Sequence, residues 1–384
     1  METDLVRNCA QVLSAEELRK KLTEGRPLRV KLGVDPTAPD IHLGHTVGLT
    51  KLRQFQDAGH QAILIIGDFT AMIGDPSGRS ATRPQLTHEE VMANAKTYQE
   101  QAFKILDPGR TRVTFNGEWF EMMSFEEVIR LNSRVTLQQM LQREDFKERM
   151  NAGHPVRAHE IQYPIMQGWD SVMIKADVEI GGTDQLFNIM VGRDLQREEG
   201  LPQQVAMLMP ILEGLDGVQK MSKSLGNAVG VTEPPIQMFG KLMSIPDDVM
   251  PKYYELLLAE PMPVGHPMDA KKQLARRIVA RFHNEADAQH ALDDFNARFS
   301  QRDLASADLP AFSLPEGGAD IVSAVVDAYA KCFNTARSRS DARRLVEQGS
   351  VQWRGEKVGD VKARLEPGAE GILKLDKTRA VRIG

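Results

Sequence analysis

KLGVDPTAPDIHLGH, residues 31–45, is the stretch that decides the fold. Residues 28–30 before it (Leu-Arg-Val) predict a short strand, bounded on one side by Gly-Arg-Pro and on the other by Gly33. Residues 46–58 after it carry apolar side chains near helical spacing and end at Gly59, which predicts a helix. A strand that leads through a loop into a helix often binds a nucleotide, because the helix N-terminus presents free N–H groups and a partial positive charge.

The tetrapeptide His-Leu-Gly-His closes this stretch. His42 and His45 are three residues apart, so in a first helical turn both imidazoles lie on one side and can donate hydrogen bonds to phosphate oxygens. Gly44 has no Cβ, so a flat adenine could lie directly on the backbone. The motif is short, and a surface helix start that happens to hold two histidines is an equally good interpretation of it alone.

A second basic motif lies far along the chain, after the apolar residues 205–212 and a turn at 213–217. Its residues suit a mobile loop that clamps a polyphosphate, with a solvated lysine loop as the alternative; they are Lys220, Met221, Ser222, Lys223 and Ser224. His-x-Gly-His after the first strand, followed about one Rossmann domain later by Lys-Met-Ser-Lys-Ser, is the two-part signature of class I aminoacyl-tRNA synthetases. The chain resembles that family.

Composition indicates a cytoplasmic protein of two or three domains. The 384 residues carry a formal charge of −5, which does not mark the whole chain as a nucleic-acid binder. Residues 331–384 differ, with 13 Lys and Arg against 7 Asp and Glu. Cys9 and Cys332 have no metal-binding spacing, which favours a reducing compartment without a disulfide. No apolar run is long enough to span a membrane, and the N-terminus has no signal-peptide pattern.

The order of elements predicts an α/β fold. Residues 5–22 are expected to form one or two amphipathic helices, and residues 62–66 form a continuous apolar run typical of a buried parallel strand. Strand, helix and strand in this order imply a right-handed βαβ unit. We therefore expect a Rossmann-like parallel-sheet catalytic domain over residues 1–219. A helical insertion at about 118–160 would serve either as an oligomer contact or in internal packing.

One helix face carries three polar groups among apolar neighbours. Tyr163, Gln167 and Asp170 stand at i, i+4 and i+7, and a ligand could supply the partners that such groups need near a core. Pro164 is tolerated in a first turn, so we expect this helix to begin close to Tyr163. Asp184 follows Gly-Gly-Thr after a predicted strand at 178–180, where it could accept ribose hydroxyls.

These motifs together resemble the bacterial-type tyrosyl-tRNA synthetases, densely in the catalytic half and by architecture in the C-terminal half. The motifs that carry the resemblance are Asp-Pro-Thr at 35–37, His-Leu-Gly-His at 42–45, Gly-Asp-Pro-Ser-Gly at 74–78, the face of Tyr163, Gln167 and Asp170, Gly-Gly-Thr-Asp-Gln at 181–185 and Lys-Met-Ser-Lys-Ser at 220–224.

The resemblance implies three sets of site residues in the catalytic half. Residues implied to act on the ATP phosphates are Thr37, His42, His45, Lys220 and Lys223. Residues implied to bind the rest of ATP and the adenylate are Asp35, Gly44, Asp184, Met221, Ser222 and Ser224. Residues implied to bind tyrosine are Lys31, Asp75, Asn116, Tyr163, Gln167, Asp170 and Gln185. In the last set, Asp170 would accept the phenol hydroxyl, Tyr163, Gln167 and Asp75 would surround the ammonium group, and Gln185 would lie near the carboxylate.

Lys31 is a departure from the family pattern. Members of the family often have a tyrosine at this position, which shares the phenol hydroxyl with the aspartate, and a cysteine where this chain has Leu32. A lysine could contact Asp170 or the phenol through a water. Arg79 and Arg83 are further candidates for phosphate contacts.

The C-terminal part is expected to bind tRNA. An α-helical anticodon-side domain at 234–302 would follow a mobile lysine loop at 220–233, and a Pro- and Gly-rich linker at 303–319 would lead to a small basic α+β domain at 320–384. The last domain resembles one shared with a ribosomal small-subunit protein, although a merely soluble basic tail is the alternative. Residues expected to hold tRNA phosphates are Arg337, Arg339, Arg343, Arg344 and Lys357.

The resemblance implies that tyrosine is activated with ATP and then transferred to tRNA(Tyr). The substrate carboxylate attacks the α-phosphate itself, so the protein needs no covalent nucleophile and supplies alignment and charge stabilisation. Mg²⁺ is expected with the ATP phosphates, without a dedicated protein metal site or a tightly bound cofactor. A homodimer is expected. The rival interpretations are a tryptophanyl enzyme, a small-molecule nucleotidylyltransferase and a non-catalytic RNA-binding protein derived from a synthetase.

Overall fold

The structure is a computed structural model that describes residues 2–76, 86–301, 304 and 307–384. The chain divides into two compact units, Met1–Glu285 and Ala286–Gly384. The end of the Gly-Asp-Pro-Ser-Gly motif (Ser77 and Gly78) and the candidate phosphate contacts Arg79 and Arg83 lie outside the described residues.

The first unit is built on a six-stranded sheet in the order β1-β6-β5-β2-β3-β4. All neighbouring strands are parallel except β1, which runs antiparallel to β6. The strands are β1 Gln11–Leu13, β2 Arg29–Val34, β3 Gln61–Ile66, β4 Thr111–Phe115, β5 Val178–Gly182 and β6 Val205–Met209. The expected α/β fold with a Rossmann-like parallel sheet is therefore confirmed, with β1 as a strand that sequence patterns did not indicate.

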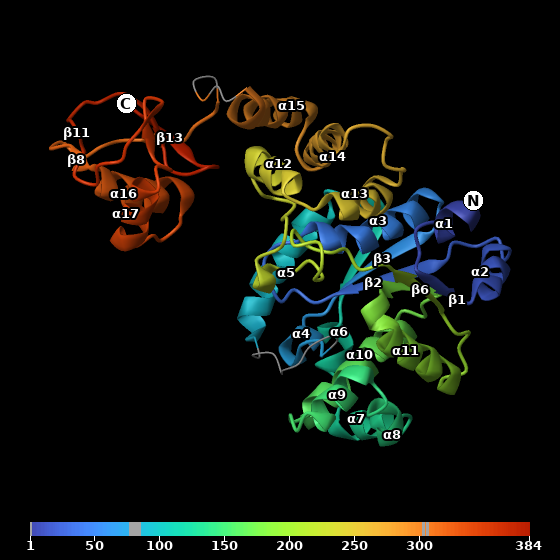
Figure 1. The fold of residues 1–384 in the computed structure, drawn as a ribbon. Coiled ribbons are helices and arrows are strands. Elements are labelled where there is room, and N and C mark those ends of the chain that lie inside the picture. The colour runs from blue at the N-terminus through green and yellow to red at the C-terminus, as the bar shows by residue number, and fades with distance from the viewer. Residues whose placement is uncertain (1, 77–85, 302–303, 305–306) are drawn as a thin grey trace. The chain divides into compact units, whose positions relative to one another are not determined.

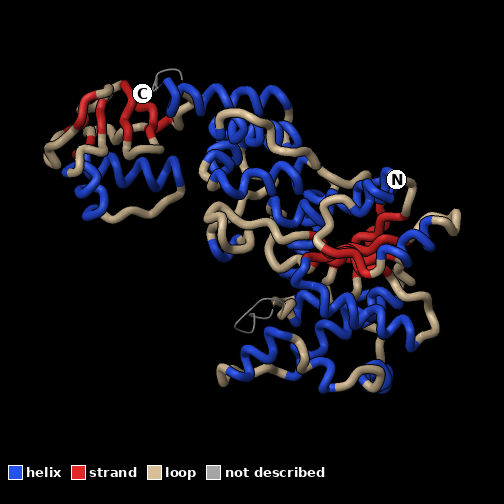
Figure 2. Tube along the Cα trace, turned by 45° about the vertical axis from the view of Figure 1, so that its right-hand side comes forward, coloured by secondary structure: helices blue, strands red, loops and turns tan. Residues whose placement is uncertain are grey.

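Helices cover both faces of this sheet (Figures 1 and 2). Helix α3 (Leu43–Asp57) packs on one face against β2, β3 and β5, whereas α11 (Leu186–Glu198), which packs on α10 (Ala158–Met173), lies against β5 and β6. The apolar residues of β3 are buried on both sides, as expected for a central parallel strand. Strand β2 extends to Val34, so the loop between it and α3 begins at Asp35 and is shorter than the motif at 31–45 suggests.

The remaining helices of the first unit are mostly short. They are α1 Glu2–Val6, α2 Ala15–Leu22, α4 Thr70–Ile73, α5 His88–Ala102, α6 Gly117–Phe120, α7 Phe125–Asn132, α8 Leu137–Met140, α9 Glu144–Asn151, α12 Pro235–Met243, α13 Met250–Tyr253 and α14 Pro267–Phe282. Residues 125–150 fall in three helices, and Thr136 caps the second of them after α7 ends. No helix in the described parts of the chain is long and apolar enough to cross a membrane.

The start of α10 was predicted wrongly. The helix begins at Ala158 and contains Pro164 in its interior, although proline cannot donate the hydrogen bond of that turn. The helix start is held instead by Glu160, which pairs with Arg149 (2.7 Å). The buried Glu160 also accepts a hydrogen bond from the Arg157 backbone N–H (2.8 Å) at the helix start.

The second unit has its own core. Its elements are α15 Glu285–Phe295 at the boundary, α16 Ile321–Phe333, α17 Arg339–Glu347, a five-stranded sheet of β7 Ala311–Phe312, β9 Gln352–Trp353, β10 Glu356–Lys357, β12 Gly371–Lys374 and β13 Ala380–Ile383, and a pair formed by β8 Ala319–Asp320 with β11 Arg364–Leu365. Ile321, Val325 and Tyr329 of α16 are buried against Leu373 and Val381 of the sheet. Strand β7 pairs in parallel with β13, so part of the linker expected at 303–319 belongs to this unit's sheet.

Candidate active site

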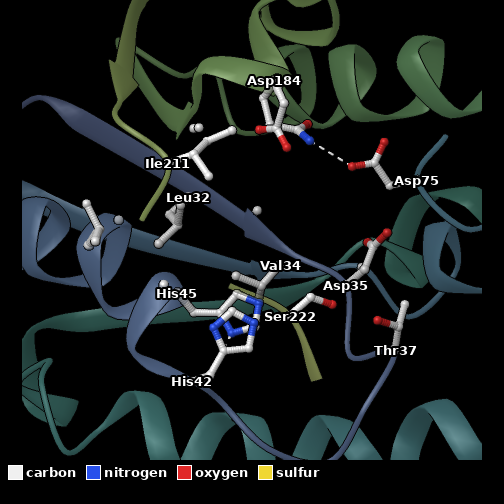
Figure 3. Close-up of a pocket in the computed structure, with 18 of the residues that line it drawn as sticks. Leu32, Val34, Asp35, Thr37, His42, His45, Asp75, Asp184, Ile211 and Ser222 are labelled. Atoms are coloured by element: carbon white, nitrogen blue, oxygen red, sulfur yellow. Dashed lines mark hydrogen bonds between the residues drawn. The ribbon is translucent and has the colours of Figure 1, made fainter. Parts of the chain in front are cut away.

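A cavity of about 590 Å³ opens at the carboxyl ends of β2, β3 and β5, where ligands bind in open α/β sheets. It brings together most of the residues expected in the catalytic half. Those that line it are Asp35, Thr37, His42, Gly44, His45, Asp75, Tyr163, Gln167, Asp170, Asp184, Gln185, Lys220, Met221, Ser222, Lys223 and Ser224. Figure 3 shows the two histidines side by side, with Asp184 and Asp75 on the opposite side of the cavity.

The two histidines form one stacked unit at the start of α3. Their ring centroids are 3.8 Å apart with an interplanar angle of 25°. The His42 backbone N–H donates to Nδ1 of His45 (3.3 Å), so the proton of neutral His45 lies on Nε2, 3.2 Å from the Tyr98 hydroxyl. His42 Nδ1 is buried and has no hydrogen-bond partner among the described residues. An imidazole nitrogen therefore remains available to a ligand.

Burial keeps both histidines neutral. Burial, and then the nearby ammonium groups of Lys223 and Lys220, lower the pKa of His42 to about 4. Burial and the neighbouring His42 lower the pKa of His45 well below its usual value. Each ring therefore offers one N–H donor at neutral pH and does not act as a fixed cation.

The lysine motif lies across the cavity with both ammonium groups paired to carboxylates. Lys220 is 2.7 Å from Asp184, and Lys223 pairs with Asp40 in the loop before the histidines. Met221 anchors the motif, because its side chain is buried and its N–H donates to the Leu212 carbonyl (2.9 Å). The two signature motifs, which are about 180 residues apart, thus face the same cavity.

Acceptors and amides line the part of the cavity next to α10. The Tyr163 hydroxyl donates to Asp35 Oδ2 (2.8 Å), which holds that carboxylate toward the cavity. The Gln185 amide donates to Asp75 Oδ2 (2.7 Å). Asn188 connects Gln185 with Gln167 of α10. Its side-chain amide donates to Oε1 of Gln185 (3.0 Å) and to Oε1 of Gln167 (2.8 Å).

Asp170 is a buried carboxyl group at the bottom of the cavity. It accepts hydrogen bonds from the indole N–H of Trp119 (3.0 Å) and the amide of Asn116 (3.4 Å). Burial raises the pKa of Asp170 to about 7, and the positive charge of Lys31 opposes part of that rise. Asn116 itself lies behind Asp170 and does not line the cavity.

Lys31 also lies behind the cavity wall. Its side chain is fully buried, and its ammonium group is 3.0 Å from Glu179. It donates to the Ser171 hydroxyl (2.7 Å) and to the Gln167 backbone carbonyl (2.8 Å). The expected approach to Asp170 or to a substrate phenol is therefore replaced, within the described part of the chain, by contacts with Glu179 and the backbone of α10.

Sequence reasoning missed several polar residues that support this site. They are Asp40, Tyr98, Trp119, Glu179 and Asn188. Two of them had a detectable signal. Glu179 is a charge in the middle of a buried strand, which requires a partner, and Trp119 carries an N–H that needs an acceptor when buried.

The basic residues of the second unit lie on its surface around α17. Arg339 pairs with Asp320 (3.3 Å), Arg343 with Glu347 (3.8 Å), and Arg344 with Asp341. The guanidinium carbon of Arg337 lies 5.1 Å from the Tyr329 ring centroid, and Lys357 is exposed on β10. In neither unit do the described residues include three or more His, Cys, Asp or Glu side chains arranged to hold a metal ion.

Comparisons with known proteins define the class first. The family model described as tRNA synthetases class I (W and Y) matches residues 23–307. Known structures share the fold: a C-terminally truncated mitochondrial tyrosyl-tRNA synthetase from Aspergillus nidulans matches with a TM-score of 0.64 at 22% identity, covering 78% of this chain and 93% of the other. The tyrosyl-tRNA synthetase from Archaeoglobus fulgidus gives 0.60 at 24% identity, covering 76% and 98%. The fold and the two motifs are those of a class I aminoacyl-tRNA synthetase.

Relatives with high sequence identity show which family within this class the chain belongs to. The tyrosine–tRNA ligase of Moorella thermoacetica is 50% identical and covers 99% of this chain and 94% of its own. That of Carboxydothermus hydrogenoformans is 49% identical, with 98% and 96% covered. The chain belongs to the tyrosine–tRNA ligases.

Proposed function

We propose that this cavity binds ATP and L-tyrosine side by side and forms tyrosyl-adenylate, which then passes its tyrosine to the terminal adenosine of tRNA(Tyr). One observation carries the proposal. The stacked histidines and both lysines of two distant motifs line the same cavity as the Tyr163, Gln167 and Asp170 face of α10.

The chemistry follows from these groups. The tyrosine carboxylate attacks the α-phosphate and pyrophosphate leaves, so the transition state carries charge on the phosphate oxygens. His42, His45 and Thr37 donate hydrogen bonds to these oxygens. Lys220 and Lys223 exchange their carboxylate partners, Asp184 and Asp40, for pyrophosphate, and this freed Asp184 takes the ribose hydroxyls. Mg²⁺ enters with the ATP phosphates as part of the substrate.

Tyrosine recognition rests on α10 and its surroundings. Asp170 accepts the phenol hydroxyl, and because it is buried, a substrate without that hydroxyl leaves one of its acceptor positions unfilled. Tyr163, Gln167 and Asp75 surround the ammonium group, and Gln185 lies near the substrate carboxylate. Asp35, Gly44, Met221, Ser222 and Ser224 contact the nucleotide.

Two macromolecular contacts complete the proposal. Arg337, Arg339, Arg343, Arg344 and Lys357 hold tRNA phosphates without reading bases. A second copy of the chain covers the apolar insertion surface, where Met122 (83%), Phe125 (78%) and Ile129 (55%) are exposed. The protein acts in the reducing cytoplasm, which is consistent with Cys9 and Cys332 both being free thiols.

The test is an ATP–pyrophosphate exchange assay with each of the twenty amino acids, followed by aminoacylation of total tRNA. Exchange with tyrosine and tyrosylation of tRNA are the expected results. Exchange with tryptophan alone would assign the enzyme to the tryptophanyl branch. RNA binding without any exchange would indicate a non-catalytic protein.

A further inference from the structure

A buried ion pair joins β2 and β5, the two central strands of the sheet, next to the turn of α10 whose Gln167 and Asp170 line the cavity. Lys31 of β2 and Glu179 of β5 are register partners on neighbouring parallel strands. Their charged groups are 3.0 Å apart, and the side chains are 0% and 1% exposed. Neither residue lines the cavity, so neither can touch a substrate held there.

Both members of the pair are bonded to the same turn of α10. Lys31 donates to the Gln167 backbone carbonyl (2.8 Å) and the Ser171 hydroxyl (2.7 Å). Glu179 accepts from the Gln167 side-chain amide (3.1 Å) through one oxygen and from Ser171 (2.9 Å) through the other. Asp170 lies between these two anchored residues and faces the cavity.

Glu179, held by Lys31, and Asn188 together decide which end of the Gln167 amide is a donor. Its Nε2 points to the Glu179 carboxylate, and its Oε1 accepts from Asn188 (2.8 Å). If the Gln167 amide were rotated by half a turn, its oxygen would face the Glu179 carboxylate and its NH₂ group would face the NH₂ group of Asn188. Since a carbonyl oxygen accepts two hydrogen bonds, Oε1 keeps one acceptor position for an ammonium group.

Stability alone is a weak reason for such a pair. Desolvation of two charges offsets much of their attraction, and replacing a buried pair by apolar groups is often neutral or stabilising. We infer that Lys31 and Glu179 are positioning residues for the amino-acid substrate: they orient Gln167 and hold the turn that carries Asp170. This inference rests on the proposed function of the cavity.

The experiment compares wild type, Lys31→Met, Glu179→Gln and the double variant in ATP–pyrophosphate exchange, with thermal unfolding measured for each. The singles should raise the KM for tyrosine about ten- to hundredfold, as expected for lost hydrogen bonds to a charged group, and leave the KM for ATP within about twofold. Each single variant leaves one buried charge without its partner, whereas the double variant leaves none. The thermal midpoint of the double variant should therefore return toward that of the wild type. The double variant's KM for tyrosine should stay raised, because the Lys31 hydrogen bonds to the Gln167 carbonyl and the Ser171 hydroxyl are lost and no carboxylate accepts from the Gln167 and Ser171 side chains.

The control is Arg149→Met with Glu160→Gln, a second buried ion pair (2.7 Å) that also involves α10 but lies near its start. This double variant should leave the KM for tyrosine unchanged. If a single variant fails to fold, the double variant decides the question. A double variant whose tyrosine KM recovers together with its thermal midpoint would make the pair merely structural and overturn the inference. A wild type without tyrosine-dependent exchange would overturn the proposed function as well.

Discussion

At the scale of single residues, burial moves the pKa values in the cavity in opposite directions. The pKa of His42 falls to about 4, whereas that of Asp170 rises to about 7. Both shifts favour the neutral form, since a low-dielectric surrounding disfavours charge of either sign. The two histidines are therefore neutral at neutral pH, whereas Asp170 changes its charge close to pH 7.

The rate of tyrosine activation should follow the ionisation of Asp170. Because its pKa is raised, the carboxyl group carries a proton below about pH 7 and then accepts the phenol hydroxyl poorly. We expect kcat/KM for tyrosine in ATP–pyrophosphate exchange to fall about tenfold per pH unit below that value. Asp170→Asn should lack this acid limb. A wild-type profile that is flat between pH 5.5 and 7.5 would contradict the assignment.

Asp170→Ala should reduce the discrimination between tyrosine and phenylalanine. The variant loses a hydrogen bond to a charged group, for which about ten- to hundredfold in the ratio of the two kcat/KM values is expected. The measurement is exchange with each amino acid at pH 8, and Asp57→Ala, on the exposed end of α3, is the control. An unchanged ratio would remove Asp170 from tyrosine recognition.

At the scale of elements, the proposed function gives the transition-state contacts to the lysine motif. Lys223→Ala should slow tyrosyl-adenylate formation by about 10²–10³, the effect of removing one preorganised charge-stabilising donor, and leave tyrosine affinity within about twofold. Single-turnover kinetics and equilibrium binding of tyrosine separate the two quantities. Lys20→Ala on α2 is the control, and a change confined to tyrosine binding would defeat the role given to Lys223.

The contact between α10 and α11 should tolerate no added atoms. Gly168→Ala would place its Cβ 2.9 Å from the backbone of Gly192, so we expect about 1–3 kcal/mol of destabilisation, seen as a lower thermal midpoint. Gly240→Ala is the matched control on α12, where nothing lies within 4 Å. That change should be neutral or stabilise by up to about 1 kcal/mol. Equal midpoints for the two variants would show that the helices can separate without cost.

The elements that sequence reasoning located are those whose signal is local. Apolar runs and helical periodicity were sufficient for β2, β3, β5 and α3, and the two motifs were sufficient to predict residues that line one cavity. Strand β1 was missed because three residues are too few to show a pattern. The start of α10 was placed too late because this helix contains a proline in its interior, against the usual rule. The partner of Lys31 is 148 residues away, so it does not follow from nearby sequence.

At the scale of the whole molecule, the proposed function places tyrosine activation in the first unit and tRNA phosphate contacts in the second. Arg343→Ala with Arg344→Ala should raise the KM for tRNA and reduce the salt dependence of binding by about one to two phosphate contacts, because both side chains are exposed on α17. Tyrosine-dependent ATP–pyrophosphate exchange should be unchanged. Arg19→Ala is the control. Loss of exchange in the double variant would mean that the second unit takes part in activation.

The strand order also determines when each strand of the sheet can find its partner during translation. β2 pairs with β3 on one edge, but its other neighbour, β5, begins only at Val178. A nascent chain therefore displays an open, apolar strand edge while the ribosome adds the intervening residues, for on the order of 7 to 30 s at usual elongation rates. That edge of β2 is closed only when β5, the strand that carries Glu179, has been made, so the middle of translation is the period in which the half-built sheet is most prone to pair with another chain.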